Sequence, residues 1–317
     1  MTLVSISSNP IPENPDTGII VTPDGVRLRY ACWSSSEARN GTVCIFTGRG
    51  ECIEKYFETI SELRARGFAV AIMDWRGQGR SSRQLANHAK GHVRDFTEYE
   101  IDVDAFMQHI VLAKCPKPYV ALAHSMGGAA MLRVAHAGKA YFEGMVLCAP
   151  LIDLPSARAS RPLRWLTRAL VHSGMGEHFV SGGKIDLAKA DGFPTNRLTS
   201  DPSRYQRNAA IVKAEPSLAI SAPTLAWLNA VFDTIAGFRN AEYARAISQP
   251  VLMVGCGRDS IVSTPAIAAF ARRLPRGSYV EIPAAKHELL HERNEHRNRF
   301  WAAFDEFIAT GLSRSGS

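Results

Sequence analysis

The sequence predicts an α/β fold built on a mostly parallel, doubly wound sheet, with a helical cap (lid) inserted into it. Short, nearly continuous apolar runs are typical of strands buried on both faces of a parallel sheet. Segments with helical spacing of apolar residues separate these runs, as strand-helix-strand crossovers require. One interval of about 100 residues breaks this alternation. We therefore expect a core from residues 1–150 and 250–317 and a cap segment from residues 151–249.

Eight runs have the composition of strands. The first two flank Pro23-Asp24-Gly25, a turn-forming triplet that joins them. The six runs that follow lie at 42–48, 68–75, 119–125, 144–150, 250–256 and 278–283. The cap segment has helical and loop-like sequence without a clear core strand. It is predicted to lie at the carboxyl edge of the sheet, where open α/β folds bind ligands.

Helical segments fill the gaps between these strands. In the gap between the first two of the six runs, apolar residues recur at helical spacing and Gly67 closes the segment: Ile53, Phe57, Ile60 and Leu63. The next gap repeats the pattern with Tyr99, Val103, Phe106 and Ile110. A further helix of small residues follows Ser125 and ends at Gly138.

Composition and charge exclude several classes of protein. With 46% hydrophobic residues the chain is neither disordered nor fibrous, and no apolar run reaches the roughly 18 residues of a membrane span. The N-terminus lacks the regions of a signal peptide, so we expect a cytoplasmic protein. The six cysteines form no C-x-x-C pair and are expected to be reduced. A net charge of +7 favours an anionic partner, but no basic segment is interleaved with aromatics, so nucleic acid is not expected.

Ser125 stands between an apolar strand and a helix of small residues. A serine on such a sharp turn projects its hydroxyl above the sheet, and the residues two positions before and after it must be small because strand and helix come close together. Ala123 and Gly127 meet that demand, although the usual pattern, G-x-S-x-G, has glycine at both positions. The sequence therefore predicts Ser125 as a nucleophile.

A serine nucleophile needs a base to take its proton and a carboxylate to orient that base. On this kind of sheet the order along the chain is serine, acid, histidine. Asp259 and His287 each follow a predicted strand. Because the carboxyl ends of parallel strands meet at one edge, we expect both side chains to lie near Ser125. Asp153 is the alternative acid.

His287 also begins an H-E-x-x-H sequence that ends at His291. On an α-helix this spacing presents two imidazoles to zinc, so a zinc metallopeptidase is an alternative. However, His287 lies four residues after Pro283, at the end of a strand, which leaves little room for a preceding helix. Asn294 and Arg297 also stand where the extended motif has a glycine and a third histidine. No metal or organic cofactor is expected, and His291 is expected on a helix surface or with satisfied ring nitrogens.

Five stretches of the chain together carry a family resemblance: FTGRGECIEKY, DWRGQGRS, AHSMGG, GRDSIV and KHELLHE. The chain resembles the serine hydrolases of the α/β-hydrolase fold, and within them the monoacylglycerol lipase and bacterial lysophospholipase branch. The resemblance runs from about residue 16 to the C-terminus. It implies hydrolysis of the acyl ester of a single-chain lipid, a lysophospholipid or a monoacylglycerol. A short-chain esterase or a serine aminopeptidase of the same fold remains an alternative.

Two backbone amides are expected to form an oxyanion hole. One belongs to Met126, the residue after the nucleophile, and the other comes from the loop after the first core strand. The resemblance assigns this second amide to Arg49, in a loop where Thr47 replaces the family's usual histidine. The Arg49 side chain has two readings, a solvated arginine or a partner for a lipid phosphate. In DWRGQGRS, Asp74 and Arg76 are expected to hold a glycine-rich turn.

The cap segment is expected to line an acyl pocket with apolar side chains. The candidates are Leu163, Leu166, Leu225, Trp227, Leu228 and Phe232. The segments NRLTSDPSRYQRN and APTLAWL resemble the lid of the bacterial lysophospholipases.

The start of the cap segment is basic. Four arginines are spaced for one face of a helix, namely Arg158, Arg161, Arg164 and Arg168, and Pro162 limits that helix to a start near Arg161. Leu163, Leu166 and Leu170 fall largely elsewhere, with Trp165 near the boundary. Such a helix can lie at an anionic lipid surface, so we expect a transient contact with the inner face of the membrane. The alternative is a lid helix with a solvated arginine face.

Overall fold

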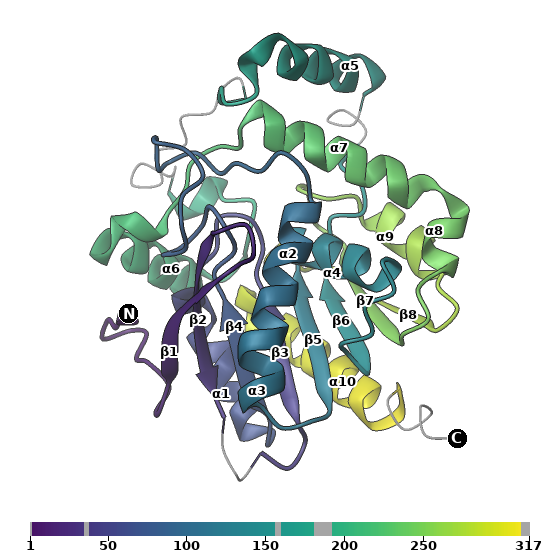
Figure 1. Cartoon of the computed structure of the whole chain (residues 1–317). Coiled ribbons are helices and arrows are strands. Elements are labelled where there is room, and N and C mark those ends of the chain that lie inside the picture. The colour runs from purple at the N-terminus through teal and green to yellow at the C-terminus, as the bar shows by residue number, and fades with distance from the viewer. Residues whose placement is uncertain (1, 35–37, 156–159, 181–191, 312–317) are drawn as a thin grey trace.

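An eight-stranded sheet forms the centre of the computed structural model, which describes residues 2–34, 38–155, 160–180 and 192–311 (Figure 1). Its strand order is β1-β2-β4-β3-β5-β6-β7-β8. The strands are β1 Asp16–Val21, β2 Arg27–Trp33, β3 Thr42–Phe46, β4 Ala69–Met73, β5 Tyr119–His124, β6 Gly144–Cys148, β7 Val251–Cys256 and β8 Gly277–Ile282. All eight strands predicted from the sequence are therefore confirmed.

Most strands pair in parallel, as their nearly continuous apolar sequence predicts. β1 pairs antiparallel with β2, and β2 pairs antiparallel with β4, whereas all other neighbours are parallel. Strands β3 to β7 are buried along their whole length, which explains their nearly continuous apolar sequence. β8 lies at the edge of the sheet and is partly exposed.

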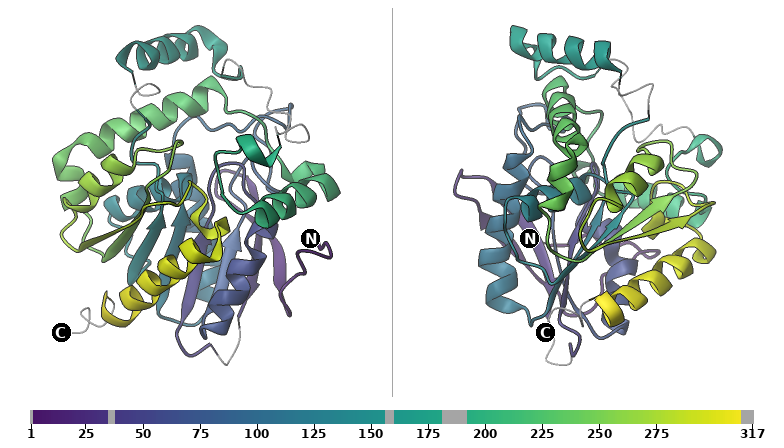
Figure 2. Two further views of the ribbon diagram at one scale, coloured as in Figure 1. Left: turned by 180° about the vertical axis from the view of Figure 1, so that it is seen from behind. Right: turned by 90° about the vertical axis from the view of Figure 1, so that its right-hand side faces the viewer.

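Helices cover both faces of the sheet. α2 and α4 lie on one face, and α1 and α10 lie on the other (Figures 1 and 2). The α-helices outside the cap segment are α1 Phe57–Ala65, α2 Thr97–Phe106, α3 Leu112–Lys114, α4 Met126–His136, α9 Thr264–Ala271 and α10 Asn294–Gly311. Shorter turns are the 3-10 helices Ile53–Tyr56 and Leu289–His291 and the π-helical turn Met107–Val111, which continues α2.

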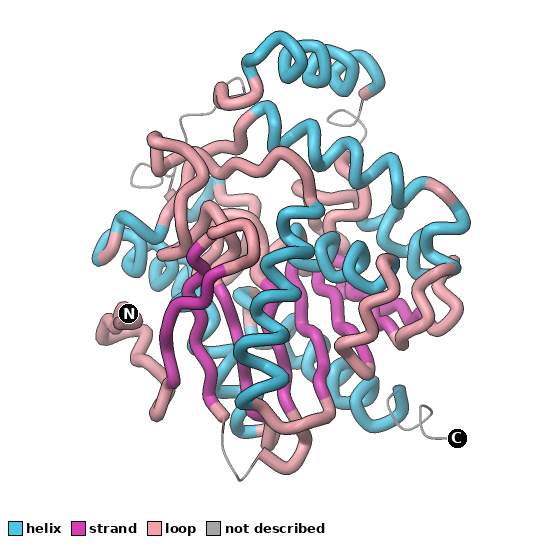
Figure 3. Tube along the Cα trace, in the orientation of Figure 1, coloured by secondary structure: helices cyan, strands magenta, loops and turns pink. Residues whose placement is uncertain are grey.

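The described part of the cap segment adds no strand to the sheet. The segment leaves after β6 and returns at β7, which is the hydrogen-bonded neighbour of β6. Its helices are α5 Arg161–Leu170, α6 Pro202–Ala214, α7 Leu225–Arg239 and α8 Ala241–Arg245, with shorter turns at Val171–Met175, Phe193–Thr195 and Pro216–Leu218. α7 lies across the upper edge of the sheet, and α5 lies above α7 in every view (Figures 1 and 2). Loops lie between α7 and the ends of the strands (Figure 3).

A buried ion network ties β2 to the loops at the carboxyl edge. Arg29 donates to both carboxylate oxygens of Glu54, each at 2.7 Å, and to Asp74 at 2.6 Å, and all three side chains are fully buried. Asp74 also accepts the amides of Ile53 and Arg80. As the DWRGQGRS stretch predicts, Asp74 holds the glycine-rich turn. The turn comes so close to Asp74 that an added Cβ at Gly79 would lie only 2.1 Å from the Asp74 carboxyl group.

We expect Arg29→Met to lower the free energy of unfolding by about 3–5 kcal/mol, because it leaves two buried carboxylates without their cation. Urea unfolding followed by circular dichroism measures this loss. The matched control is Arg27→Met, which changes an exposed arginine of the same strand and should cost less than about 0.5 kcal/mol. Equal losses in the two variants would contradict a structural role for the network.

Candidate active site

Ser125 occupies a strained turn between β5 and α4. Its backbone has φ 51° and ψ −113°, in a region that residues with a side chain rarely adopt. The helix that follows comes so close to β3 that an added Cβ at Gly127 would lie 2.3 Å from the carbonyl oxygen of Phe46. On the strand side, Ala123 is buried in β5, and its methyl group is accommodated. The turn thus has the geometry that the small residues around Ser125 predict.

His287 links Ser125 to Asp259. Its Nε2 atom lies 3.0 Å from the Ser125 hydroxyl, and its Nδ1 atom lies 2.7 Å from a carboxylate oxygen of Asp259. The other carboxylate oxygen of Asp259 accepts the amides of Ile261 and Val262. Burial alone would raise the pKa of Asp259, but the hydrogen bond from His287 and these two amides hold it below its ordinary value. Asp259 is therefore an ionised acceptor that fixes the orientation of the imidazole.

Asp153, the alternative acid, has other partners. It accepts hydrogen bonds from Arg239 at 2.6 and 3.0 Å, and Arg164 lies 3.7 Å away. Asp153 lies at the start of the cap segment and the two arginines lie on its helices α5 and α7, so these contacts tie the start of the segment to its helices. The geometry favours Asp259 as the partner of His287.

The cap segment also holds the loop that carries His287. On one side of the histidine, Lys286 Nζ donates to the carbonyl oxygen of Asn196 at 2.9 Å. On the other side, the amide of Glu288 donates to the carbonyl oxygen of Leu198 at 2.8 Å. The position of the histidine therefore depends on contacts made across the boundary between core and cap segment.

His291 does not share an α-helix with His287. It ends the three-residue 3-10 helix Leu289–His291 and lies edge-to-face against Tyr56, with ring centres 5.4 Å apart. The zinc alternative needs two imidazoles on one helical face, and this backbone does not provide it. The expectation of an exposed or satisfied His291 is wrong. The ring is buried, the described residues offer no hydrogen-bond partner to either nitrogen, and burial together with nearby Lys55 holds its pKa well below the ordinary value.

Two backbone amides lie at the ends of elements that converge on Ser125. Met126 is the first residue of α4, where the amide has no acceptor within the helix. In the loop after β3, the amide of Gly48 donates to Glu51 at 2.5 Å and the amide of Gly50 donates to Gln78. Among the described residues, none accepts the Arg49 amide between them. This arrangement leaves the Met126 and Arg49 amides available to an oxygen atom of a substrate.

Glu51 and His124 form a buried pair that the sequence reasoning missed. His124 Nδ1 lies 3.1 Å from Glu51, and its Nε2 donates to the carbonyl oxygen of His287 at 3.1 Å. Burial alone would raise the pKa of Glu51, but Lys55 and His124 hold it well below its ordinary value. Burial alone would lower the pKa of His124, but Glu51 raises it. The Glu51 carboxylate thus favours the protonated form of His124, whose ring connects the loop after β3 to the backbone of His287.

The family comparison fits this geometry. Residues 37–294 match the family model described as serine aminopeptidase, S33. The chain belongs to this family. Lysophospholipase L2 of Escherichia coli (strain K12) is 31% identical over 305 residues, which cover 93% of this chain and 87% of that protein. The monoacylglycerol lipase of Mycolicibacterium smegmatis is 24% identical and covers 75% of this chain and 77% of its own.

Solved structures match the fold as well. A soluble variant of monoglyceride lipase from Saccharomyces cerevisiae, bound to a substrate analogue, superposes with a TM-score of 0.72 at 20% identity, covering 95% of this chain and 97% of that chain. The predicted α/β-hydrolase fold is therefore confirmed. As a member of the S33 family with lipase and lysophospholipase relatives, the chain is a hydrolytic enzyme.

The Arg49 side chain packs against the cap segment of this hydrolase. Its guanidinium lies 5.1 Å from the centre of the Trp227 ring and donates to the carbonyl oxygen of Ser221 at 2.7 Å. Burial lowers the pKa of Arg49 to about 10. The reading of a solvated arginine is therefore wrong, because the side chain is half-buried between core and cap segment. A contact with a lipid phosphate stays a prediction.

The apolar candidates of the cap segment lie in two places. Those on α7 are buried or half-buried over the sheet edge: Leu225, Trp227, Leu228 and Phe232. Trp227 Nε1 donates to the Tyr99 hydroxyl at 3.2 Å. Leu163 is half-buried on α5, which packs on α7, whereas Leu166 is 49% exposed. The structure thus brings the α7 residues together and leaves Leu166 facing solvent.

We expect Glu51→Gln to lower kcat by about 100-fold. The substitution weakens the contact through His124 that holds the backbone of His287, and a small misplacement of a reacting group has a cost of that order. Without the carboxylate, His124 loses the partner that raises its pKa and cannot donate from both nitrogens. Ester hydrolysis measures the rate, and NMR titration of the imidazole measures the pKa of His124. Glu242→Gln, which changes an exposed carboxylate on α8, is the control.

The same substitution should change how stability depends on pH. The folded pKa of His124 lies above its ordinary value of 6.5, so its stabilising contribution is complete below that pH and is lost as pH rises through the raised folded pKa. Glu51→Gln should weaken this dependence in urea unfolding. A variant with the wild-type kcat and the wild-type His124 pKa would refute the role of the pair.

Proposed function

We propose that the chain is a serine hydrolase that cleaves the acyl ester of single-chain lipids, a lysophospholipid or a monoacylglycerol. The observation that carries this proposal is the continuous hydrogen-bonded series from Asp259 through His287 to Ser125 on a strained strand-to-helix turn. Support for the lipid class comes from the relatives named lysophospholipase L2 and monoacylglycerol lipase, which align over most of this chain.

The first half of the reaction forms an acyl-enzyme. His287 Nε2 takes the proton of Ser125, whose oxygen attacks the ester carbonyl carbon. The carbonyl oxygen gains negative charge, and the amides of Met126 and Arg49 stabilise it. As the tetrahedral intermediate collapses, the bond to the leaving alcohol breaks and His287 returns its proton to that alcohol. Asp259 stabilises the imidazolium through the bond to Nδ1.

The second half releases the fatty acid. Water attacks the acyl carbonyl while His287 accepts its proton, and the same two amides stabilise the new oxyanion. Collapse breaks the bond to Ser125, and His287 gives the proton back to the serine oxygen. These steps use only side chains and amides of this chain and require no cofactor.

The acyl chain needs an apolar site, and we propose that residues 151–249 act as a cap that provides it. Four apolar side chains of α7 support this role because they are buried or half-buried, namely Leu225, Trp227, Leu228 and Phe232. The helix itself lies across the edge of the sheet where the strands end (Figure 1). Leu163 of α5 would extend this lining. Leu166 does not fit it, since this side chain faces solvent.

We expect Ser125→Ala and His287→Ala each to lower kcat by at least about 1,000-fold, because the members of such a series act as a unit. A panel of lysophospholipids, monoacylglycerols, short-chain esters and aminoacyl amides measures both rate and preference. Cleavage confined to short esters or to amides would replace the lipid assignment by a short-chain esterase or an aminopeptidase.

His291→Ala is the matched histidine control for this experiment. It should lower the melting temperature, since His291 packs against Tyr56, but leave kcat within a few-fold of the wild type. A chelator should have no effect on the rate. If His291→Ala were as damaging as His287→Ala, or if the chelator abolished activity, a metal-dependent reaction would be the better account.

α5 presents an outward surface that is both apolar and basic. Trp165 is 73% exposed and Leu166 is 49% exposed, and Arg161 and Arg168 are exposed beside them. The expectation that Arg164 shares this surface is wrong. Its side chain turns inward, where it lies over the Phe232 ring and near Asp153. Arg158 lies outside the described residues.

We infer that this surface of α5 makes a transient contact with anionic lipid on the inner face of the membrane. Exposed tryptophan and leucine beside arginine is the pattern of helices that lie in a lipid interface. The position of α5, farthest from the sheet, leaves the surface accessible (Figure 2). Across the described ranges, no helix is long and apolar enough to cross a bilayer. We propose a peripheral contact of a cytoplasmic enzyme.

We expect Arg161→Gln combined with Arg168→Gln to weaken partitioning onto phosphatidylglycerol vesicles by about 30-fold, since each arginine near such a surface contributes about 1 kcal/mol. Co-sedimentation at low salt measures this change. Hydrolysis of a vesicle-borne lysolipid should slow accordingly, while a soluble short-chain ester should be cleaved at the wild-type rate.

The control for vesicle binding is Arg272→Gln combined with Arg276→Gln, two exposed arginines elsewhere that change the net charge equally. If both double variants lose binding to the same extent, only net charge matters. Unchanged binding in the α5 variant would eliminate docking and leave a solvated lid helix.

A further inference from the structure

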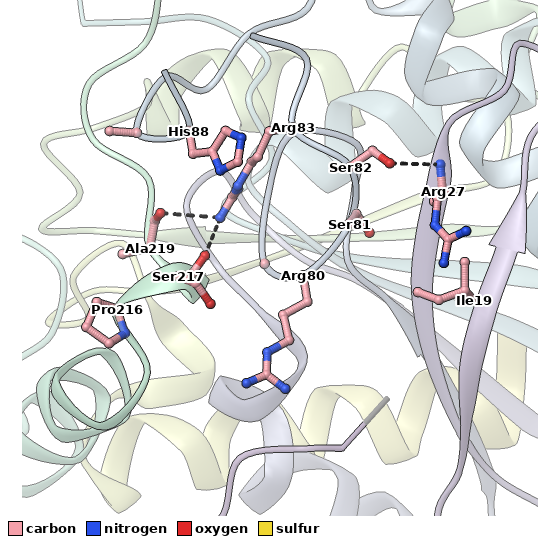
Figure 4. Close-up of a pocket in the computed structure, with 12 residues that line it drawn as sticks. Ile19, Arg27, Arg80, Ser81, Ser82, Arg83, His88, Pro216, Ser217 and Ala219 are labelled. Carbon is pink, nitrogen blue, oxygen red and sulfur yellow. Dashed lines mark hydrogen bonds between the residues drawn. The ribbon is translucent and has the colours of Figure 1, made fainter. Parts of the chain in front are cut away.

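A pocket of about 610 Å³ lies between the core and the cap segment, apart from the serine centre (Figure 4). One wall is the turn Gly79–Arg83 together with the first residue of β2, and the opposite wall is the cap turn Pro216–Ala219. Neither Ser125 nor His287 lines it. The pocket is therefore a separate feature of the molecule that the hydrolytic reaction does not use.

Four basic side chains line this pocket, and no acidic side chain does: Arg27, Arg80, Arg83 and His88. Arg80 is paired with Glu215 of the cap segment. Within the described part of the chain, Glu215 is the one carboxylate that pairs with any of the four. Arg27 is exposed at the start of β2. The pocket thus carries an excess of positive charge.

Arg83 is the most constrained of the three arginines. Its guanidinium donates to the carbonyl oxygens of Gly77, at 2.6 Å, and of Ser217 and Ala219 in the cap segment. Burial lowers the pKa of Arg83 below its ordinary value, and its hydrogen-bond partners are neutral carbonyls rather than carboxylates. A charge that is partly removed from water and lacks a counter-ion attracts an anion.

The shape and lining of the pocket select among anions. Guanidinium groups match the oxygen geometry of phosphate, which accepts several charge-assisted hydrogen bonds at once. Ile19, Ala89 and Pro216 add apolar surface next to the arginines. A pocket of this size holds more than a bare ion, so its chemistry suits a phosphate group attached to a small organic part.

We propose that this pocket binds the phosphate group of a small organic phosphate or of a phospholipid headgroup. The ligand would contact both walls and would therefore add to the contacts that hold the cap turn against the core. This proposal does not depend on the reaction proposed at Ser125, because neither Ser125 nor His287 lines the pocket.

Isothermal titration calorimetry of the full chain with inorganic phosphate and with glycerol 3-phosphate, at constant ionic strength, tests the proposal. We expect measurable binding to the wild type and a Kd at least tenfold weaker in Arg27→Gln and in Arg83→Gln. Arg83→Gln also removes a tether to the cap segment, so Arg27→Gln keeps the test valid if the former is unstable. Arg94→Gln, an exposed arginine outside the pocket, should bind as the wild type does.

The two sources of phosphate are separated with phosphatidylglycerol vesicles, in a background of Arg161→Gln, Trp165→Ala, Leu166→Ser and Arg168→Gln that removes the α5 surface. Weaker vesicle binding on adding Arg27→Gln, but not on adding Arg94→Gln, identifies a lipid headgroup. Unchanged vesicle binding alongside tight glycerol 3-phosphate binding identifies a free organic phosphate. If neither small phosphate binds the wild type, or if Arg94→Gln weakens binding equally, the proposal is overturned.

Discussion

The close approach of α4 to the end of β3 is the constraint on which the rest of the site depends. No side chain fits at Gly127, where an added Cβ would meet the Phe46 carbonyl oxygen at 2.3 Å. Beside this approach Ser125 has a positive φ. Its amide donates to the Cys148 carbonyl oxygen at the end of β6, and its own carbonyl oxygen accepts the Leu151 amide. The same approach brings the start of α4, which carries the Met126 amide, close to the loop after β3. The strained backbone of Ser125 is therefore part of what holds the serine, the Met126 amide and the loop after β3 in place.

The sequence predicted most of the fold and the Ser125, Asp259 and His287 arrangement for simple physical reasons. Strands buried on both faces must be apolar throughout, so β3 to β7 are visible as runs. Parallel strands end at one edge, so residues that follow β7 and β8 can meet the residue that follows β5. Small residues beside a serine indicate that the strand before it and the helix after it lie close together. Each of these signals lies in a short stretch of sequence, and the topology of the sheet brings the residues together.

Other features of the site depend on contacts between distant segments, which the sequence pattern does not reveal. Glu51 and His124 are 73 positions apart, and only the folded chain pairs them. His291 is the last residue of the H-E-x-x-H sequence, which suggests either a metal ligand or a surface residue. It packs in the interior instead, because a 3-10 turn stands where the motif would need an α-helix. Arg164 has the spacing of an exposed face, but its long side chain reaches inward to Asp153. In each case a tertiary contact overrides the local pattern.

The cap segment departs from β6 and returns at β7, and these two strands are hydrogen-bonded neighbours. Its two ends are thus held at a fixed, short separation by the sheet itself. The entropy of closing a loop grows only slowly with its length, so insertions or deletions between these ends disturb the sheet little. Evolution can therefore exchange the inserted segment of such a molecule as a module while Ser125, Asp259 and His287 stay where they are. Grafting the cap of one relative onto the core of another is the corresponding route in engineering, with the junctions at residues 150 and 250.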